Sequence, residues 1–173
     1  MTARNVVFYP DPDLRAPNRP VTEFNAELET LTSDMLETMY AHDGIGLAAP
    51  QIGVHQNVVV IDIPEEDGSQ GKHQLILINP RITELAGEEV ESEEGCLSVP
   101  EYRDKVTRHS ICSVSYQDLE GKEQSIEKAE GLLAICLQHE LDHLQGKVFV
   151  DYLSRLKRSR LQKKYAKLLQ DKH

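Results

Sequence analysis

The chain contains no tryptophan, only three cysteines and no long apolar run, and these absences exclude several classes of protein. Three cysteines without the spacing of a disulfide framework indicate thiols in a reducing compartment rather than a disulfide-stapled secreted fold. No stretch approaches the roughly 20 apolar residues that span a bilayer. The first ten residues also lack the apolar block of a secretory signal peptide. We therefore expect a cytoplasmic protein without a membrane partner.

Length and charge predict one domain of uneven charge. At 173 residues the chain can bury one substantial core, and we expect a single domain over residues 1–173 because no linker or internal repeat interrupts it. The net charge is −10, yet residues 154–173 hold eight Lys or Arg against one Asp. Apolar residues at helical spacing in this segment predict a basic C-terminal helix.

Periodicity along the rest of the chain predicts an α+β fold. Residues 25–42 have the cap and apolar stripe of a helix, and residues 130–145 form an apolar helix that ends before a glycine. Four short runs have strand composition: 57–63, 74–78, 111–116 and 123–127. Residues 65–71 form a polar loop without a functional signal. We expect short antiparallel or mixed strands around a central buried helix, with a further helix near each end.

Two histidines bracket a glutamate in the segment His139-Glu140-Leu141-Asp142-His143. On a helix, positions i and i+4 share one face, so both imidazoles can bind one metal ion. Glu140 would lie at the rim of that site, where a carboxylate can take a proton from water. A surface helix with two unrelated histidines is the plainer alternative. The apolar run 131–137 favours burial, and buried histidines and carboxylates need charged or metal partners.

A catalytic metal site of this kind needs a third protein ligand. Phe149 stands where a metzincin has its third histidine, and no glutamate follows the helix motif. Asp151 remains one candidate. The segment 94–100, Glu-Gly-Cys-Leu-Ser-Val-Pro, offers a better one, because glycine and proline mark a tight backbone around Cys96. A cysteine thiolate is a strong ligand for zinc or ferrous iron.

Residues 44–53, Gly-Ile-Gly-Leu-Ala-Ala-Pro-Gln-Ile-Gly, superficially match the glycine fingerprint of dinucleotide-binding folds. That fingerprint must follow a strand and open a helix, whereas here a helix precedes it and Pro50 breaks any helix inside it. We therefore expect an extended segment whose backbone can approach a ligand closely. The Gln51 amide is available there as a hydrogen-bond donor.

Taken together, these segments resemble the motifs of the peptide deformylase family. Residues 44–51 match Gly-φ-Gly-φ-Ala-Ala-x-Gln, residues 94–98 match Glu-Gly-Cys-φ-Ser, and residues 138–143 match Gln-His-Glu-φ-Asp-His, where φ is apolar. The motifs occur in the family's order, and the similarity extends over nearly the whole chain. The resemblance implies an enzyme that removes the N-formyl group from the N-terminal methionine of newly made polypeptides and releases formate.

The resemblance also implies a role for each motif. Three side chains would hold one divalent metal ion: Cys96, His139 and His143. The resemblance favours Fe(2+), with Zn(2+), Ni(2+) or Co(2+) as alternatives. Glu140 would transfer the proton of a metal-activated water. The Gln51 amide and the Leu97 backbone N–H would stabilise the oxyanion.

A pocket for the methionine side chain follows from the same resemblance. Four residues would wall it: Ile45, Leu132, Ile135 and Cys136. Core packing explains Leu132 and Ile135 equally well. The Gly46 backbone and Arg103 would align the peptide, although Arg103 taken alone is an ordinary surface charge.

The basic segment 154–173 leaves two interpretations open. Family resemblance favours a contact with the ribosome, since deformylases act on chains that emerge from it, whereas a solvated amphipathic helix is the plainer explanation. We further expect a monomer. A small zinc endopeptidase stays open as an alternative function, but it leaves residues 44–51 and 94–98 without a purpose. A non-catalytic ribosome-associated protein would leave Glu140 unexplained.

Overall fold

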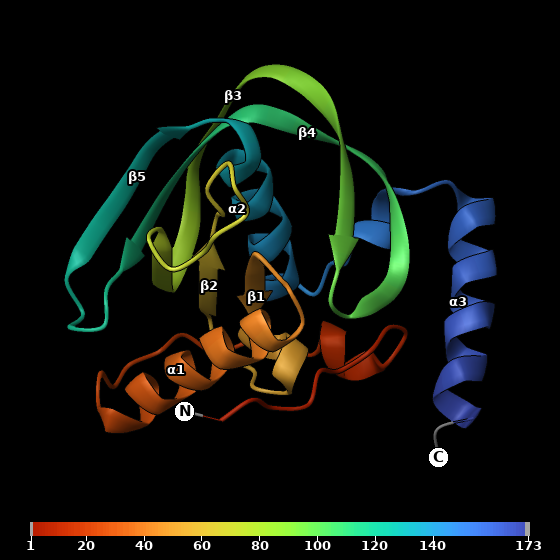
Figure 1. The fold of residues 1–173 in the computed structure, drawn as a ribbon, viewed down its shortest axis with the longest axis horizontal. Helices are drawn as coiled ribbons and strands as arrows, with labels where there is room; N and C mark the ends of the chain where they lie inside the picture. Colours follow the sequence, from red (N-terminus) through yellow and green to blue (C-terminus); the bar gives the residue numbers. More distant parts are fainter. Residues whose placement is uncertain (1, 172–173) are drawn as a thin grey trace.

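The computed structural model describes residues 2–171 and has an α+β architecture (Figure 1). Its helices are α1 (Ala26–Ala41), α2 (Gly131–Leu144) and α3 (Arg155–Asp171). Its strands are β1 (Gly46–Ala48), β2 (Val58–Asp62), β3 (Gln74–Cys96), β4 (Val99–Gln117) and β5 (Glu123–Ala129). Residues 2–171 contain no helix that combines the length and the apolar character needed to span a bilayer.

The strands form one sheet in the order β1-β2-β3-β4-β5, and every neighbouring pair is antiparallel. β3 and β4 dominate the sheet as a long hairpin that arches over the molecule (Figure 1). Their register runs from Ile78 opposite Gln117 to Cys96 opposite Val99, with four shifts along the way. Only two residues separate Cys96 from Val99. This is the tight backbone that the sequence around Cys96 predicts.

α2 lies beneath this arch and is buried along most of its length (Figure 1). Leu137 of α2 belongs to one apolar cluster with Val59 of β2, Leu77 of β3 and Val114 of β4. The helix ends at Leu144, two residues before a glycine whose φ of 75° is left-handed and free of strain only for glycine. Because its surroundings are apolar, the polar groups on this helix are removed from water and need partners.

α1 covers the opposite side of the short strands β1 and β2. Alternate residues of β2 face opposite helices: Val58 and Val60 pack in the cluster of α1, and Val59 and Ile61 in the cluster of α2. The side chain of Asn25 caps α1 by accepting a hydrogen bond from a backbone N–H of the first turn. β1 and β2 are therefore a buried layer between two helices, which fixes the position of β1.

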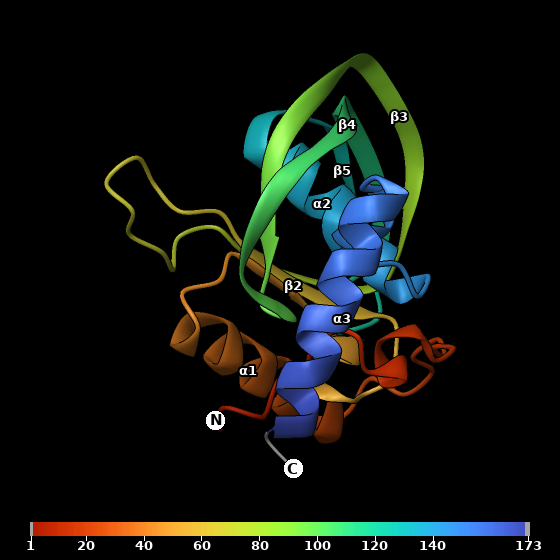
Figure 2. The ribbon, with the colours of Figure 1, turned by 90° about the vertical axis from the view of Figure 1, so that its right-hand side faces the viewer.

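α3 lies on the outside of the molecule, at the right of Figure 1 and facing the viewer in Figure 2. It packs through Leu161 and Tyr165, which are buried, and the Tyr165 hydroxyl donates a hydrogen bond to the carbonyl of Pro100. Its basic residues are exposed. The expected C-terminal helix over residues 154–173 corresponds to Arg155–Asp171, and residues 172–173 lie outside the described part of the chain.

The two central strands are much longer than the sequence predicts. The run expected at 74–78 continues to Cys96, and the run expected at 111–116 begins at Val99. The added residues of β3 are mostly exposed and rich in glutamate, so they lack the apolar alternation of a half-buried strand. Pairing with β4 holds them in place, and such long-range pairing leaves no local pattern in the sequence.

Candidate metal centre

Three potential metal ligands meet where the end of β3 approaches α2. The Cys96 sulfur lies 3.5 Å from Nε2 of His143, and that nitrogen lies 3.3 Å from Nε2 of His139. All three ligand atoms fall within 4.8 Å of one another, and this is the only such group among residues 2–171. The i, i+4 spacing on α2 brings the two rings together as predicted, and the hairpin turn brings the sulfur to them.

This donor set fits a divalent metal ion. Two Nε2 atoms that face each other at 3.3 Å form at most one hydrogen bond, whereas a cation satisfies both. One thiolate and two imidazoles suit zinc or ferrous iron, and three protein ligands leave a fourth position for water. Asp151 is not the third ligand, because its carboxylate pairs with Arg15 at 2.9 Å and accepts the N–H of Val148.

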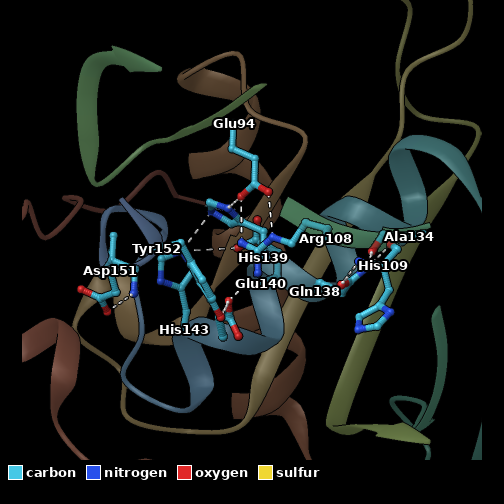
Figure 3. Close-up of polar contacts among 12 residues, drawn as sticks. Glu94, Arg108, His109, Ala134, Gln138, His139, Glu140, His143, Asp151 and Tyr152 are labelled. Carbon is cyan, nitrogen blue, oxygen red and sulfur yellow. Dashed lines mark hydrogen bonds and ion pairs between the residues drawn. The ribbon is translucent and has the colours of Figure 1, made fainter. Parts of the chain in front are cut away.

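A hydrogen bond at Nδ1, the nitrogen that faces away from the other two ligands, orients the His139 ring. Nδ1 of His139 lies 2.8 Å from Glu94 Oε1, and Glu94 accepts two hydrogen bonds from Arg108 at 2.7 and 2.8 Å (Figure 3). Burial opposes ionisation of Glu94, but the hydrogen bonds from Arg108 and His139 outweigh it and lower the pKa of the carboxyl. An ionised Glu94 keeps the proton on Nδ1, which leaves Nε2 free to bind a metal.

Arg108 connects this carboxylate to the rest of the site. Its guanidinium is buried, donates to Asp142 at 2.7 Å and lies 4.7 Å from the centre of the Tyr152 ring. The Tyr152 hydroxyl donates to the same Asp142 oxygen at 2.8 Å. The network thus joins β4, α2 and the short 3-10 helix η3 (Phe149–Tyr152) around one buried cation.

His143 lacks such support. Its side chain is 1% exposed, and Nδ1 has no hydrogen-bond partner among residues 2–171. Only Nε2 of this ring has polar neighbours: the Cys96 sulfur, Nε2 of His139 and, at 4.0 Å, Glu140 Oε1. No hydrogen bond on the outer nitrogen orients the ring, which meets the His139 ring edge to face with centroids 5.0 Å apart. The two predicted histidine ligands are therefore held in different ways.

Glu140 is buried beside the two rings. Burial raises the pKa of its carboxyl to about 7, with the charge of His139 opposing the shift. β1 passes very close to it: a Cβ on Gly46 would lie 2.5 Å from Glu140 Oε2 and 2.9 Å from the Cys136 sulfur. Only glycine allows this approach. A carboxyl that titrates near neutral pH is suited to take up and return a proton.

Gln51 points its amide at the ligand sulfur. It lies in the 3-10 helix η2 (Ala49–Ile52), where its Oε1 accepts the Ala48 N–H at 2.9 Å. This contact fixes the amide so that Nε2 donates to the Cys96 sulfur at 3.3 Å and to Ser98 Oγ at 3.1 Å. Leu97 follows Cys96 in the hairpin turn and lines the same cleft. Both predicted oxyanion donors therefore lie next to the third ligand.

A cleft of about 810 Å³ opens onto these groups. All six predicted substrate-contact residues line it: Ile45, Gly46, Arg103, Leu132, Ile135 and Cys136. Leu132 is 47% exposed, so core packing does not explain it, whereas Ile135 and Cys136 are nearly buried. Arg103 is exposed and already paired, since it donates to the Glu93 carbonyl at 3.1 Å and lies 3.5 Å from the Glu93 carboxylate.

Arg108 and Tyr152 carry no local sequence signal of a role in the site, and Glu94 stands out in the sequence only as part of the motif around Cys96. Arg108 shares the inward side of β4 with Val106, since both are buried two positions apart. A charge at an inward position of a strand is a useful signal of a buried ion pair. This signal can be recognised only when residues 99–110 are known to form a strand.

Comparisons with known proteins all find the same family. The family model described as polypeptide deformylase matches residues 3–159. A peptide deformylase from Nitrosococcus oceani is 52% identical over 96% of this chain and 96% of its own length. A crystal structure of a peptide deformylase from Legionella pneumophila has a TM-score of 0.88 and 45% identity, covering 99% of this chain and 98% of that one. The Ehrlichia chaffeensis enzyme in complex with actinonin has a TM-score of 0.88 and 41% identity, covering 96% and 98%.

Proposed function

The chain belongs to the peptide deformylase family, and we propose that it acts on newly made polypeptides through the centre formed by Cys96, His139 and His143. It is a metal-dependent amidohydrolase that removes the formyl group from an N-terminal methionine. One observation carries the assignment to these residues: three ligand atoms lie within 4.8 Å of one another beside a buried glutamate that faces the cleft.

Glu140 is the proton carrier of the reaction. A divalent metal ion, when bound, would lower the pKa of a water molecule and polarise the formyl carbonyl. Glu140 takes a proton from the attacking water and returns it to the amine as the C–N bond breaks, so formate and a free N-terminus are released. Burial raises the pKa of this carboxyl, which favours uptake of the proton before its return to the amine.

Gln51 and Leu97 stabilise the charge that develops on the formyl oxygen. The Gln51 Nε2 group is a donor held in position by the Ala48 contact, and it lies beside the ligand sulfur. The backbone N–H of Leu97 belongs to the same hairpin turn. Donors fixed before the reaction need no rearrangement when the charge forms, which is why such groups lower the barrier.

The cleft binds the methionine side chain and the start of the peptide. Ile45, Leu132 and Ile135 provide apolar walls for a thioether chain, and the Cys136 sulfur lies nearby. We assign peptide alignment to the backbone of Gly46, which runs past Glu140 along the cleft. Arg103 contributes to peptide alignment at the rim of the cleft, where its ion pair with Glu93 limits how far the side chain can extend.

A direct assay tests this assignment. The purified protein is given a formyl-Met tripeptide, and in parallel an unformylated peptide of the same length. We expect formate and a new N-terminus from the first and no cleavage of the second. Internal cleavage of either peptide without formate would instead support the small zinc endopeptidase.

We propose Fe(2+) as the native metal, with Zn(2+), Ni(2+) or Co(2+) able to occupy the same ligands. A sulfur ligand with two imidazoles accepts all of these ions, so availability and oxidation decide which one is bound. The test is metal analysis after strictly anaerobic purification, with activity measured on the same sample. Zinc at full occupancy and full activity would reverse the choice.

We propose that α3 contacts the ribosome through its exposed basic side chains. Seven Lys or Arg residues lie on its exposed surface: Arg155, Lys157, Arg158, Arg160, Lys163, Lys164 and Lys167. Leu161 and Tyr165 pack against the body, so charge can change without loosening the helix. Cations on an otherwise acidic protein favour a contact with phosphate groups.

Charge reversal tests the ribosome contact. Lys163→Glu with Lys167→Glu should weaken co-sedimentation with ribosomes and flatten its salt dependence. The matched control reverses Lys72 and Lys122, which lie elsewhere on the surface. Equal co-sedimentation of the two double variants would exclude α3 as the contact.

We also propose that residues 1–173 act as one cytoplasmic metallohydrolase domain and as a monomer. Equilibrium sedimentation tests the expected monomer. The three cysteines form no disulfide, which is consistent with a reducing compartment.

A further inference from the structure

The loop between β2 and β3 has no functional signal in its sequence, yet it is tied to the segment that borders the cleft. Nε2 of Gln70 donates hydrogen bonds to the Gly44 carbonyl at 3.1 Å and to the Asp62 carbonyl at 2.9 Å. Gly44 lines the cleft and precedes β1. In Figure 2 the loop, in yellow, projects from the body above α1. The Gln70 amide connects it to the segment that borders the cleft.

A buried carboxylate anchors the same loop. Asp62 is fully buried, and its Oδ2 accepts the Gly71 N–H at 2.7 Å and the Tyr40 hydroxyl. The Tyr40 oxygen in turn accepts a hydrogen bond from Gln74 at 2.8 Å. Gly71 directly follows Gln70, so this anchor holds the amide close to both of its acceptors.

The segment before β1 is held at consecutive backbone groups. The Gly44 N–H donates to the Met39 carbonyl of α1 at 2.9 Å, and the Gly44 carbonyl accepts from Gln70. The next carbonyl, that of Ile45, accepts the N–H of Asp62 at 2.8 Å. Among these contacts the one from Gln70 is the only bond donated by a side chain, so one substitution can remove it while the backbone bonds stay.

Gly46, the first residue of β1, has little room to move. Gly46 approaches Glu140 and Cys136 so closely that no Cβ fits. A shift of a few tenths of an ångström in this segment therefore changes the space between the peptide-aligning backbone and the proton carrier. Because this backbone aligns the peptide, such a shift weakens peptide binding before it affects the reacting groups.

We propose that Gln70 is a positioning residue: it fixes the Gly44 carbonyl and thereby sets the course of β1 along the substrate cleft. This inference rests on the proposed function, in which the Gly46 backbone aligns the formylated peptide. Gln70 neither lines the cleft nor contacts the metal ligands, so its loss affects peptide binding more than chemistry or metal content.

The test compares three single variants of the full-length protein. Gln70→Glu keeps the size of the side chain and removes the donor, and Gln70→Ala removes the donor without adding a charge. Ser69→Ala is the matched control, because the Ser69 side chain contacts only Asp67 within the same loop. KM and kcat are measured with a formyl-Met tripeptide, and hydrogen exchange is measured at residues 44–48.

Both Gln70 variants should raise KM about tenfold, the effect of one or two lost hydrogen bonds, while kcat and metal content stay within about twofold. Amide exchange at residues 44–48 should quicken in both and remain at the wild-type rate in Ser69→Ala. Unchanged KM and unchanged exchange in the Gln70 variants would overturn the inference, as would equal changes in Ser69→Ala or a loss confined to kcat. If wild-type protein releases no formate, the proposed function fails, and hydrogen exchange still reports whether Gln70 holds β1.

Discussion

The two sides of the metal centre are built from different kinds of structure. α2 supplies three groups from five consecutive residues: His139, Glu140 and His143. The β3–β4 hairpin supplies its groups through strand pairing and a turn: Glu94, Cys96 and Arg108. The groups that react are thus encoded locally, whereas most of the groups that orient them depend on contacts between distant residues.

The same contrast separates the two histidines on α2. The hairpin reaches His139 through Glu94, so one ring is fixed by a charged hydrogen bond. Nδ1 of His143 has no such partner in the described part of the chain, and only its Nε2 meets other polar atoms. We therefore expect changes on the hairpin to alter the metal site through His139, and changes at Glu140 to alter chemistry alone.

The largest effect should come from the helix side. Glu140→Gln preserves shape but cannot carry the proton, so kcat should fall by about 10²–10⁴-fold. Metal content should match the wild type, because Glu140 is not one of the three ligands and its carboxylate lies 4.0 Å from the nearest ligand nitrogen, Nε2 of His143. Steady-state kinetics and metal analysis on one preparation measure both quantities. Near-normal turnover would remove Glu140 from the proton transfer.

Arg108→Met tests the hairpin side through stability. The substitution leaves Glu94 and Asp142 without their shared cation in a buried site, and the free energy of unfolding should fall by about 3–5 kcal/mol. Arg103→Met is the control on the same strand, because its 61% exposed side chain contributes little to stability. Urea unfolding compares the two. Equal losses in the free energy of unfolding would mean that the buried ion pairs add no more to stability than an exposed one.

Glu94→Gln should weaken the metal site without abolishing it. The neutral amide holds the His139 ring less firmly, and loss of such a partner lowers metal affinity by about 10–100-fold. The neighbouring Glu93→Gln changes charge equally at an exposed position and should leave affinity unaltered. Competition with a chelator measures the affinity of each. If the two variants bind metal equally well, His139 needs no acceptor, and the two histidines are equivalent.

The sequence predicts the helix side of the site well because its signals are local. The spacing of His139 and His143 on an apolar helix is enough to predict a shared metal, and the structure brings the two rings together as expected. The glycine and proline around Cys96 predict the tight turn that delivers the sulfur. Each of these inferences uses residues a few positions apart, where helix and turn geometry are determined by the chain itself.

The hairpin could not be predicted in the same way. The acidic stretch of β3 before Glu94 has no apolar alternation, and its strand exists because β4 pairs with it. Without that strand, Arg108 is one more charged residue in a polar segment. Gln70 is hidden for the same reason, since its acceptors lie in a segment that the fold, not the local sequence, brings beside it.

The smallest expected effect lies at the outer edge of the Arg108 network. Tyr152→Phe keeps the ring beside Arg108 but removes the hydroxyl that donates to Asp142, which should lower the free energy of unfolding by about 1 kcal/mol. Tyr152→Leu also removes the ring and should lower it by about 0.5–1 kcal/mol more. Combining each change with Arg108→Met in a double-mutant cycle separates coupling from simple packing. If the two changes are additive, Tyr152 only covers the network, and the support of His139 ends at Arg108.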